Sequence, residues 1–249
     1  MRFRVALACS AASLALVGAA RADCAKLPSH AQLHQALVAS VKPAGGPSNG
    51  GIDLNMWATI VDRDGTVCAV TFSGKDRGDQ FPGSRVISAQ KANTANAFSL
   101  NGFALSTANL FSAAQPGGSL FGLQESNLMN PAVAYAGNAE TYGTESDPMV
   151  GQHLGGVIVF GGGLALYDKS GVVGAVGVSG DSACADHNIA WRIRKALGLG
   201  SVPSGVSPNK DDGIIYDIGA GASKSGWGHP TCGGKEPDVA KEIGSGVGP

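Results

Sequence analysis

Residues 157–180 read Val-Ile-Val-Phe-Gly-Gly-Gly-Leu-Ala-Leu-Tyr-Asp-Lys-Ser-Gly-Val-Val-Gly-Ala-Val-Gly-Val-Ser-Gly, and this stretch decides the fold. It contains apolar runs separated by glycines and by a short polar turn, the pattern of strands joined by tight connections. The turn at residues 168–171 predicts that 164–167 and 172–178 form an antiparallel hairpin. The run at 155–160 is predicted to be a further strand.

Upstream of this stretch, a second hairpin is predicted from the β-rich runs 56–61 and 66–72, which a turn containing Asp-Gly joins. Helices are predicted over 29–43, over the alanine-rich segment 84–100, and over 183–197. The order is helix, hairpin, helix, long loop, strands, helix. It predicts an α/β protein of the α+β type, with an antiparallel sheet of about five strands and flanking helices.

Two segments lack sustained periodicity. Residues 101–155 contain several Pro and Gly turns, and a loop of that length inside a compact domain is commonly functional. Residues 201–249 are rich in Gly, Pro, Ser and Asp, and we expect a partly ordered extension tied down by Cys232.

The first 22 residues have the pattern of a secretory signal peptide. Arg2 and Arg4 precede an apolar run over 5–20, which ends in Ala20-Arg21-Ala22. A membrane anchor is the alternative, but the run is shorter than the ~20 residues that cross a bilayer, and no later run is long enough to span one. We therefore expect a periplasmic or secreted protein.

Charge argues against nucleic acid as a partner. Removing residues 1–22 takes away three of the eighteen Lys and Arg residues and none of the nineteen Asp and Glu residues, which leaves a mild excess of acid. Phosphate binding requires clustered Lys and Arg, and the sequence has no such cluster.

Four cysteines remain after residue 22: Cys24, Cys68, Cys184 and Cys232. An even number in an exported chain predicts two disulfides. Metal ligation is the alternative, and it is disfavoured because no two of these cysteines have C-x-x-C spacing. The sequence leaves all three pairings open.

Two motifs make the chain similar to a known family. The first is Ala89-x-Lys91-Ala92-x-Thr94-Ala95, and the second combines the glycines at 161–163, the run 174–180, and Asp186 with Ala190. In this order they resemble the GlcG/HbpS-like family, also described as haem-degrading or PduO C-terminal-like. The resemblance covers roughly residues 29–199 and suggests a domain over 23–200.

The chain departs from the family pattern in three ways. No proline follows the glycine triplet, the loop at 101–155 is expanded, and the cysteine-bearing extension is additional. The resemblance implies an α/β sandwich that forms homo-oligomers and binds haem or a related small planar tetrapyrrole as its cofactor or ligand.

Candidate haem-binding residues follow from the side chains that haem iron accepts. His153, at the end of the long loop, is the preferred axial ligand, and His187 beside Asp186 is another candidate. Backbone groups near Ser179 would suit a propionate at a helix start, although Ser179, Asp181 or Ser182 acting as a helix cap is the favoured alternative. The long loop adds Tyr142, Met149, Met129 and Tyr135 as candidate contacts, with ordinary packing as the favoured alternative for any one of them.

Three functions remain open from the sequence. The first is an exported haem or tetrapyrrole binder that acts as a carrier, sensor partner or accessory factor. The second is a small-molecule or haem-modifying enzyme using the same loop-covered site. Hydrolysis and nucleotide-phosphate binding are disfavoured, because the chain lacks G-x-S-x-G and phosphate-loop motifs. The third is an oligomeric accessory protein without ligand. The first two require the long loop to enclose a hollow over the glycine-lined sheet edge.

Overall fold

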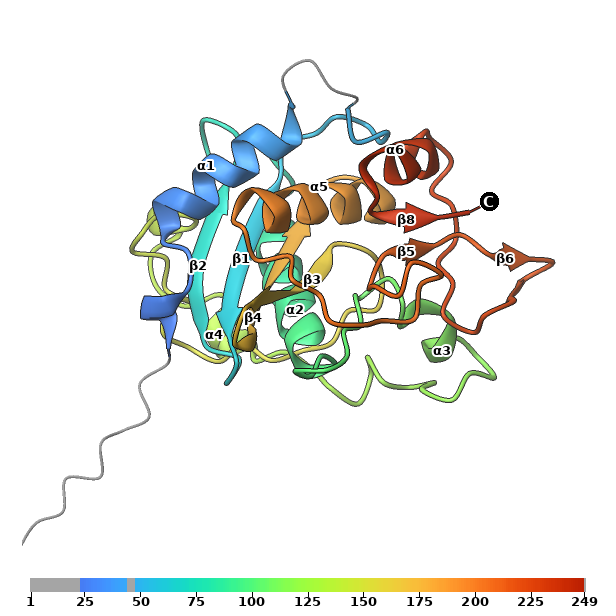
Figure 1. The fold of residues 1–249 in the computed structure, drawn as a ribbon. Coiled ribbons are helices and arrows are strands. Elements are labelled where there is room, and N and C mark those ends of the chain that lie inside the picture. The colour runs from blue at the N-terminus through green and yellow to red at the C-terminus, as the bar shows by residue number, and fades with distance from the viewer. Residues whose placement is uncertain (1–22, 44–47, 249) are drawn as a thin grey trace, which may run out of the picture.

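The computed structural model describes residues 23–43 and 48–248, so the predicted signal peptide lies outside the described residues. A four-stranded sheet with strand order β2-β1-β4-β3 forms the centre, and every neighbouring pair is antiparallel (Figure 1). Its strands are β1 (Trp57–Asp62), β2 (Val67–Phe72), β3 (Gly163–Asp168) and β4 (Gly171–Ser179). Both predicted hairpins are confirmed.

Turn chemistry explains the first hairpin. The Asp62 carboxylate accepts the N–H groups of Asp64 and Thr66, at 3.0 and 2.8 Å, which closes the turn. Gly65 has a φ of 82°, in the left-handed region that glycine enters without a Cβ penalty. These bonds join residues close in the sequence, so they favour the turn without help from long-range packing.

The prediction of a strand over residues 155–160 is wrong, and the main sheet has four strands instead of about five. In this segment, backbone N–H groups that would bond a neighbouring strand donate to side chains instead. The Ile158 N–H donates to Thr94 Oγ1 at 3.0 Å, and the Val159 N–H donates to Gln124 Oε1 at 3.3 Å. The segment is therefore a buried loop, although its composition is typical of a strand.

Helices cover both faces of the sheet. On one face lie α1 (His30–Val41) and α5 (Ala183–Ala196), and on the other lies α2 (Ser84–Ala97) (Figure 1). A Cβ at Gly177 would lie 2.0 Å from the Ser88 carbonyl oxygen, so this glycine allows α2 to approach β4 closely. The helix also presents small side chains to the sheet, and Ala89, Ala92 and Ala95 are fully buried.

The long loop contains only short helical turns: α3 (Phe111–Ala114), α4 (Pro131–Ala134) and η2 (Ala139–Thr141). A further short turn, η1 (Cys24–Lys26), precedes α1. The extension forms β5 (Ile214–Ile215), β6 (Ile218–Gly219), β7 (Ala222–Ser223), α6 (Glu236–Ile243) and β8 (Gly246–Val247).

Two disulfides form, and their pairing answers the question that the sequence left open. Cys24 pairs with Cys68, and Cys184 pairs with Cys232. The first joins the segment before α1 to β2, and the second joins α5 to the extension. Each bond therefore ties a peripheral segment to the central sandwich.

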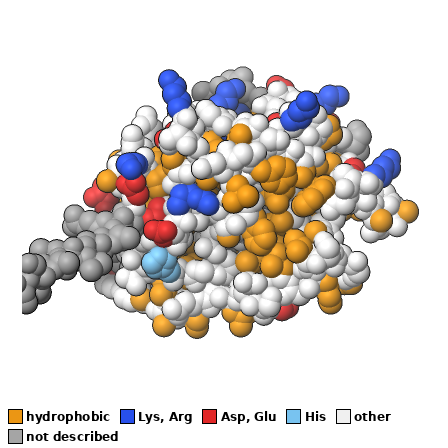
Figure 2. Space-filling model, turned by 60° about the horizontal axis from the view of Figure 1, so that its bottom comes forward, with side chains coloured by type: hydrophobic (Ala, Val, Ile, Leu, Met, Phe, Trp, Pro, Cys, Tyr) orange, Lys and Arg blue, Asp and Glu red, His pale blue; other side chains and the backbone are white. Residues whose placement is uncertain are grey.

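Within the described ranges, none of the helices combines the length and hydrophobicity that a bilayer crossing requires. The surface nevertheless carries large apolar side chains. Figure 2 shows hydrophobic side chains gathered on one face of the molecule. In the long loop, Phe121, Leu128 and Tyr135 are among the exposed large hydrophobic residues.

Candidate functional site

The glycine triplet after residue 160 packs tightly against neighbouring backbone, which contradicts the expected hollow at this sheet edge. A Cβ at Gly162 would lie 2.5 Å from the Val178 carbonyl oxygen, and one at Gly163 would lie 2.4 Å from the Lys91 carbonyl oxygen. A Cβ at Gly161 would meet the Ala183 carbonyl oxygen at 2.3 Å. These glycines permit close packing of α2, β4 and α5, and a guest molecule has no space there.

The two motifs that mark the family meet in a buried ion pair. Lys91 Nζ lies 2.6 Å from Asp186 Oδ2 and donates to the Val178 carbonyl oxygen at 3.0 Å. The Asp181 N–H donates to the other oxygen of Asp186 at 2.9 Å. Burial lowers the pKa of Lys91 and raises the pKa of Asp186 to about 6. Asp186 therefore joins α5 to α2, and its buried carboxylate is bonded within the protein through both oxygens.

His187 and Ser179 are also enclosed. His187 is fully buried, its Nε2 lies 3.2 Å from the Ser245 carbonyl oxygen, and burial lowers its pKa to about 3. Ser179 is buried at the end of β4. The helix cap is supplied by Ser182, whose Oγ accepts the Ala185 N–H at 3.2 Å. The capping alternative is therefore confirmed, with Ser182 as the cap.

His153 and Met149 lie apart from this group. His153 is exposed, and its Nε2 lies 3.2 Å from Thr66 Oγ1, at the turn end of the β1–β2 hairpin. Met149 is fully buried in the core beneath α2. The structure thus does not bring the six predicted haem-binding residues together. Of these six, Tyr142 lines the cavity that is described next.

That cavity, which we call the aromatic pocket, has a volume of about 440 Å³. It lies at the open end of the β1–β2 hairpin. Four segments form its walls: the start of β1, the loop after β2, the start of α2 and part of the long loop. Its lining residues are Trp57, Asp76, Arg77, Gly78, Pro82, Gly83, Arg85, Val86, Tyr135, Ala139 and Tyr142.

A buried guanidinium forms part of the wall. Arg85 donates through Nε to Asp147 Oδ2 at 2.8 Å, through a second nitrogen to Asp147 Oδ1, and through Nη1 to the Ala134 carbonyl oxygen at 2.7 Å. Its Cζ lies 3.6 Å from the centre of the Tyr142 ring. Tyr142 donates its hydroxyl to the Ala136 carbonyl oxygen at 3.1 Å. This network fixes the ring of Tyr142 as a rigid face of the pocket.

The outer part of the pocket is more accessible. Arg77 lies 2.7 Å from Glu140 in a partly exposed ion pair, and the Tyr135 side chain is exposed. Trp57, deeper in the pocket, is buried, and its Nε1–H has no hydrogen-bond partner among the described residues. The pocket thus offers aromatic surfaces and an arginine at a surface position, whereas the Trp57 N–H is enclosed by the protein.

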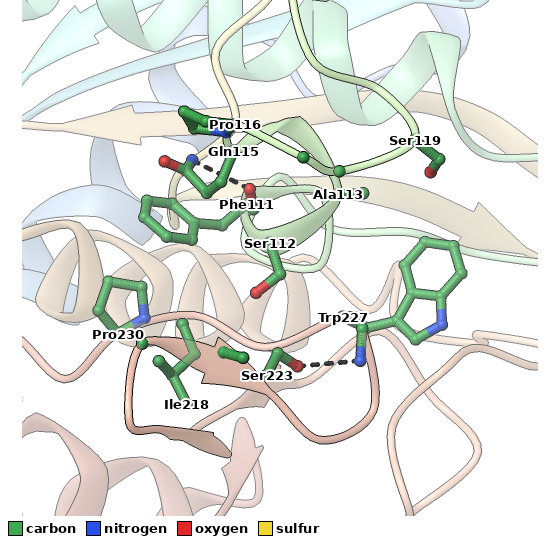
Figure 3. Close-up of a pocket in the computed structure, with 15 residues that line it drawn as sticks. Phe111, Ser112, Ala113, Gln115, Pro116, Ser119, Ile218, Ser223, Trp227 and Pro230 are labelled. Carbon is green, nitrogen blue, oxygen red and sulfur yellow. Dashed lines mark hydrogen bonds between the residues drawn. The ribbon is translucent and has the colours of Figure 1, made fainter.

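A larger hollow of about 770 Å³, the extension pocket, lies between α3 and the C-terminal extension (Figure 3). His229, in the extension, is buried against Phe111 of the pocket wall. The Gly161 N–H donates to His229 Nε2 at 3.2 Å, so Nδ1 carries the hydrogen that is donated to the Pro230 carbonyl oxygen at 2.7 Å. Burial lowers the pKa of His229 to about 4.

The four-stranded sheet, the helices on its two faces and the Lys91–Asp186 pair define an α/β sandwich with the paired motifs described above. A family model described as "Haem degrading protein HbpS-like" matches residues 49–194, which is more than half of the chain. The protein therefore belongs to the HbpS-like family. Residues 195–249, including Cys232 and the extension side of the larger pocket, lie outside the match.

Among solved structures, the chain is similar to the Klebsiella pneumoniae protein ORFY, with 25% identity, coverage of 69% of this chain and 90% of that chain, and a TM-score of 0.46. It is similar to a PduOC:heme complex at 23% identity, with coverage of 69% and 93% and a TM-score of 0.47. A Streptomyces reticuli HbpS double mutant gives 15% identity, coverage of 78% and 99%, and a TM-score of 0.44. No curated protein sequence is significantly similar to the chain.

Proposed function

We propose that this protein binds haem or a related planar tetrapyrrole in the aromatic pocket. The observation that carries the proposal is the grouping of Trp57, Tyr135 and Tyr142 around one cavity, with Arg77 and Arg85 in its wall. Family membership points to the same chemistry, because the description of the matching family names haem. Aromatic walls with few polar groups are typical of small-molecule sites.

The residues present fit such a ligand. A tetrapyrrole offers a wide apolar face, which the aromatic rings would cover, and carboxylates, which a guanidinium recognises with two parallel hydrogen bonds. Arg77 is suited to a carboxylate because it is partly exposed and its partner Glu140 lies at the surface.

Haem, when bound, would supply an iron centre, and tyrosine is one side chain that can hold haem iron. Tyr135 is the better placed of the two tyrosines. Its side chain is exposed, whereas the Tyr142 hydroxyl already donates to the Ala136 carbonyl oxygen. His153 would be too distant, because the β1–β2 hairpin separates it from Trp57 by about five residues, or roughly 17 Å.

Titration of the purified protein with haemin, followed at the Soret band, tests this proposal. We expect saturable binding, a shifted band in Tyr135→Phe, and weaker binding in Arg77→Ala. His153→Ala serves as the matched control and should bind as the unmodified chain does. Haemin binding that responds to His153→Ala and ignores Tyr135→Phe and Arg77→Ala would overturn the assignment to this pocket.

We further propose that the protein acts after export, as a binder or carrier and not as a catalyst. Two disulfides support an oxidising compartment, and the pattern of residues 1–22 supports cleavage before Asp23. Expression of the full chain in a bacterial host, followed by N-terminal sequencing, should find Asp23 as the first residue. An uncleaved cytoplasmic product would contradict export.

A homo-oligomeric state belongs to the same proposal. Exposed apolar side chains such as Phe121 and Leu128 support it, because monomeric proteins rarely leave large apolar patches in water. Light scattering coupled to size-exclusion chromatography would give the mass directly. A mass equal to that of a single chain across the concentration range would contradict this part of the proposal.

A further inference from the structure

The extension pocket is a hollow of about 770 Å³ with walls from two distant segments. Residues 111–119 of the long loop form one wall, and residues 218–230 of the extension form the other (Figure 3). The second wall lies outside the region that the family model matches. A ligand of this pocket would therefore contact residues outside the family match, and its binding would not depend on haem.

None of the fifteen residues that line the extension pocket has an ionisable side chain. A charged ligand would leave water there without gaining a counter-ion from the walls, which is unfavourable. By contrast, the aromatic pocket contains two arginines and an aspartate. The composition of the extension pocket thus favours an uncharged ligand.

Aromatic rings come from both walls. Phe111 belongs to α3 and Trp227 to the extension, and Figure 3 shows them on different sides of the hollow. Neither side chain is fully buried, so part of each ring remains available for contact. Flat aromatic faces of this kind bind the C–H-bearing faces of other molecules, and tryptophan combines such a face with an N–H donor.

Neutral polar groups lie between the rings. Gln115 uses its amide nitrogen to bond the Phe111 carbonyl oxygen at 3.1 Å, which leaves its side-chain oxygen as an acceptor. The Ser119 hydroxyl has no bonding partner in the described part of the chain, and it is exposed. Gly117 and Gly221 also line the pocket, and their exposed backbone N–H and C=O groups form no hydrogen bonds within the described residues. These groups are suited to ligand hydroxyls.

The two walls are held together by direct bonds. Ser112 Oγ donates to the Gly228 carbonyl oxygen at 2.6 Å, and the ring centres of Phe111 and His229 are 5.1 Å apart. The Cys184–Cys232 disulfide anchors the extension to α5 close to this point. A pocket whose walls are already fixed loses less conformational entropy when a ligand binds.

We propose that the extension pocket binds an uncharged saccharide. Such a ligand combines hydroxyl groups, which match the neutral polar groups of the walls, with an apolar ring face, which matches Trp227 and Phe111. The pocket volume lies within the range of about 300–1,000 Å³ found for small-molecule sites. An anionic sugar or a phosphorylated sugar would lack any cationic partner among the lining residues.

Saturation-transfer NMR with maltotriose, cellotriose and chitotriose tests the proposal on the full exported chain with its disulfides intact. At least one neutral trisaccharide should receive saturation, and glucose 6-phosphate should not. Trp227→Ala should weaken binding at least tenfold. Phe121→Ala is the matched control, because this exposed aromatic residue of the same loop does not line the pocket, and binding should be unchanged.

A second variant guards against loss of folding. Ala222→Arg places a long side chain at an exposed lining position and should abolish saccharide binding while circular dichroism and melting remain unchanged. The proposal is overturned if no trisaccharide binds, or if binding persists in both Trp227→Ala and Ala222→Arg. It is also overturned if a proline octapeptide binds at Trp227 while every saccharide fails, since the groove would then recognise a peptide.

Discussion

Lys91 and Asp186 lie 95 residues apart in the sequence, and their side chains meet at 2.6 Å in the interior of the protein. Each belongs to one of the two motifs by which the chain resembles its family. Their pairing joins α2 and α5, which lie on opposite faces of the sheet, next to the glycine triplet at 161–163. The two motifs therefore supply a buried ion pair that connects the helices of the sandwich.

Removing one partner of this pair should destabilise the protein strongly. Lys91→Met leaves the Asp186 carboxylate buried without its cation, and breaking a buried pair in this way costs about 3–5 kcal/mol. Urea unfolding measures the loss. In the double variant Lys91→Met with Asp186→Asn, the uncompensated charge is absent, so we expect part of the stability to return. A double variant as unstable as Lys91→Met alone would contradict this account.

The sequence predicted the elements whose signals are local. Ser29 caps α1 through a reciprocal pair of bonds with Gln32, and turn residues close both hairpins of the sheet. The segment 155–160 could not be assigned correctly by the same means, because apolar composition does not reveal which groups will bond the backbone. There the partners are side chains of Thr94 and Gln124, far away in the sequence.

The candidate sites were harder to predict for a related reason. The position of Tyr142 in the long loop predicts a ligand contact, but Trp57 and Arg77 come from segments that carry no site motif and meet Tyr142 only in the folded chain. The carboxylate beside His187 makes this histidine a candidate ligand in the sequence, and the fold buries it completely. A single sequence does not distinguish a histidine that faces a cavity from one that packs in the core.

Buried neutral histidines should make stability depend on pH. The pKa of His187 is lowered from 6.5 to about 3 by burial, so the unfolded chain binds a proton more readily than the folded chain does. Its contribution is therefore retained above about pH 6.5 and lost as the pH falls toward about 3. Between about pH 7 and about pH 5, linkage predicts a loss of about 2 kcal/mol from this residue.

His187→Gln tests this linkage, because glutamine can still donate to the Ser245 carbonyl oxygen but does not titrate in this range. Urea unfolding of both proteins at the two pH values gives the difference directly. The variant should lose less stability on acidification than the unmodified chain. Equal losses in the two proteins would show that other groups account for the acid sensitivity.

Loss of the disulfide in the extension should lower stability as well. Cys184 and Cys232 are 48 residues apart, and closing a loop of that length in the unfolded chain is worth about 4 kcal/mol in the chain-entropy account. The variant Cys184→Ser with Cys232→Ser should therefore unfold at lower urea concentration. Because the same bond anchors one wall of the extension pocket, hydrogen exchange should also increase over 218–230, while β1 and β4 remain protected.

The close contact between α2 and β4 gives a prediction with a matched control. A Cβ at Gly177 would lie 2.0 Å from the Ser88 carbonyl oxygen and 2.4 Å from the Ala92 nitrogen, both of them backbone atoms that cannot rotate away. Gly177→Ala should therefore cost about 1–3 kcal/mol or more, since the helix must move from the sheet. At Gly102, an added Cβ would meet nothing within 4 Å, so Gly102→Ala should change stability little. Thermal unfolding of the two variants separates a steric effect from the general loss of glycine flexibility, and equal melting temperatures would show that α2 can shift away from β4 at little cost.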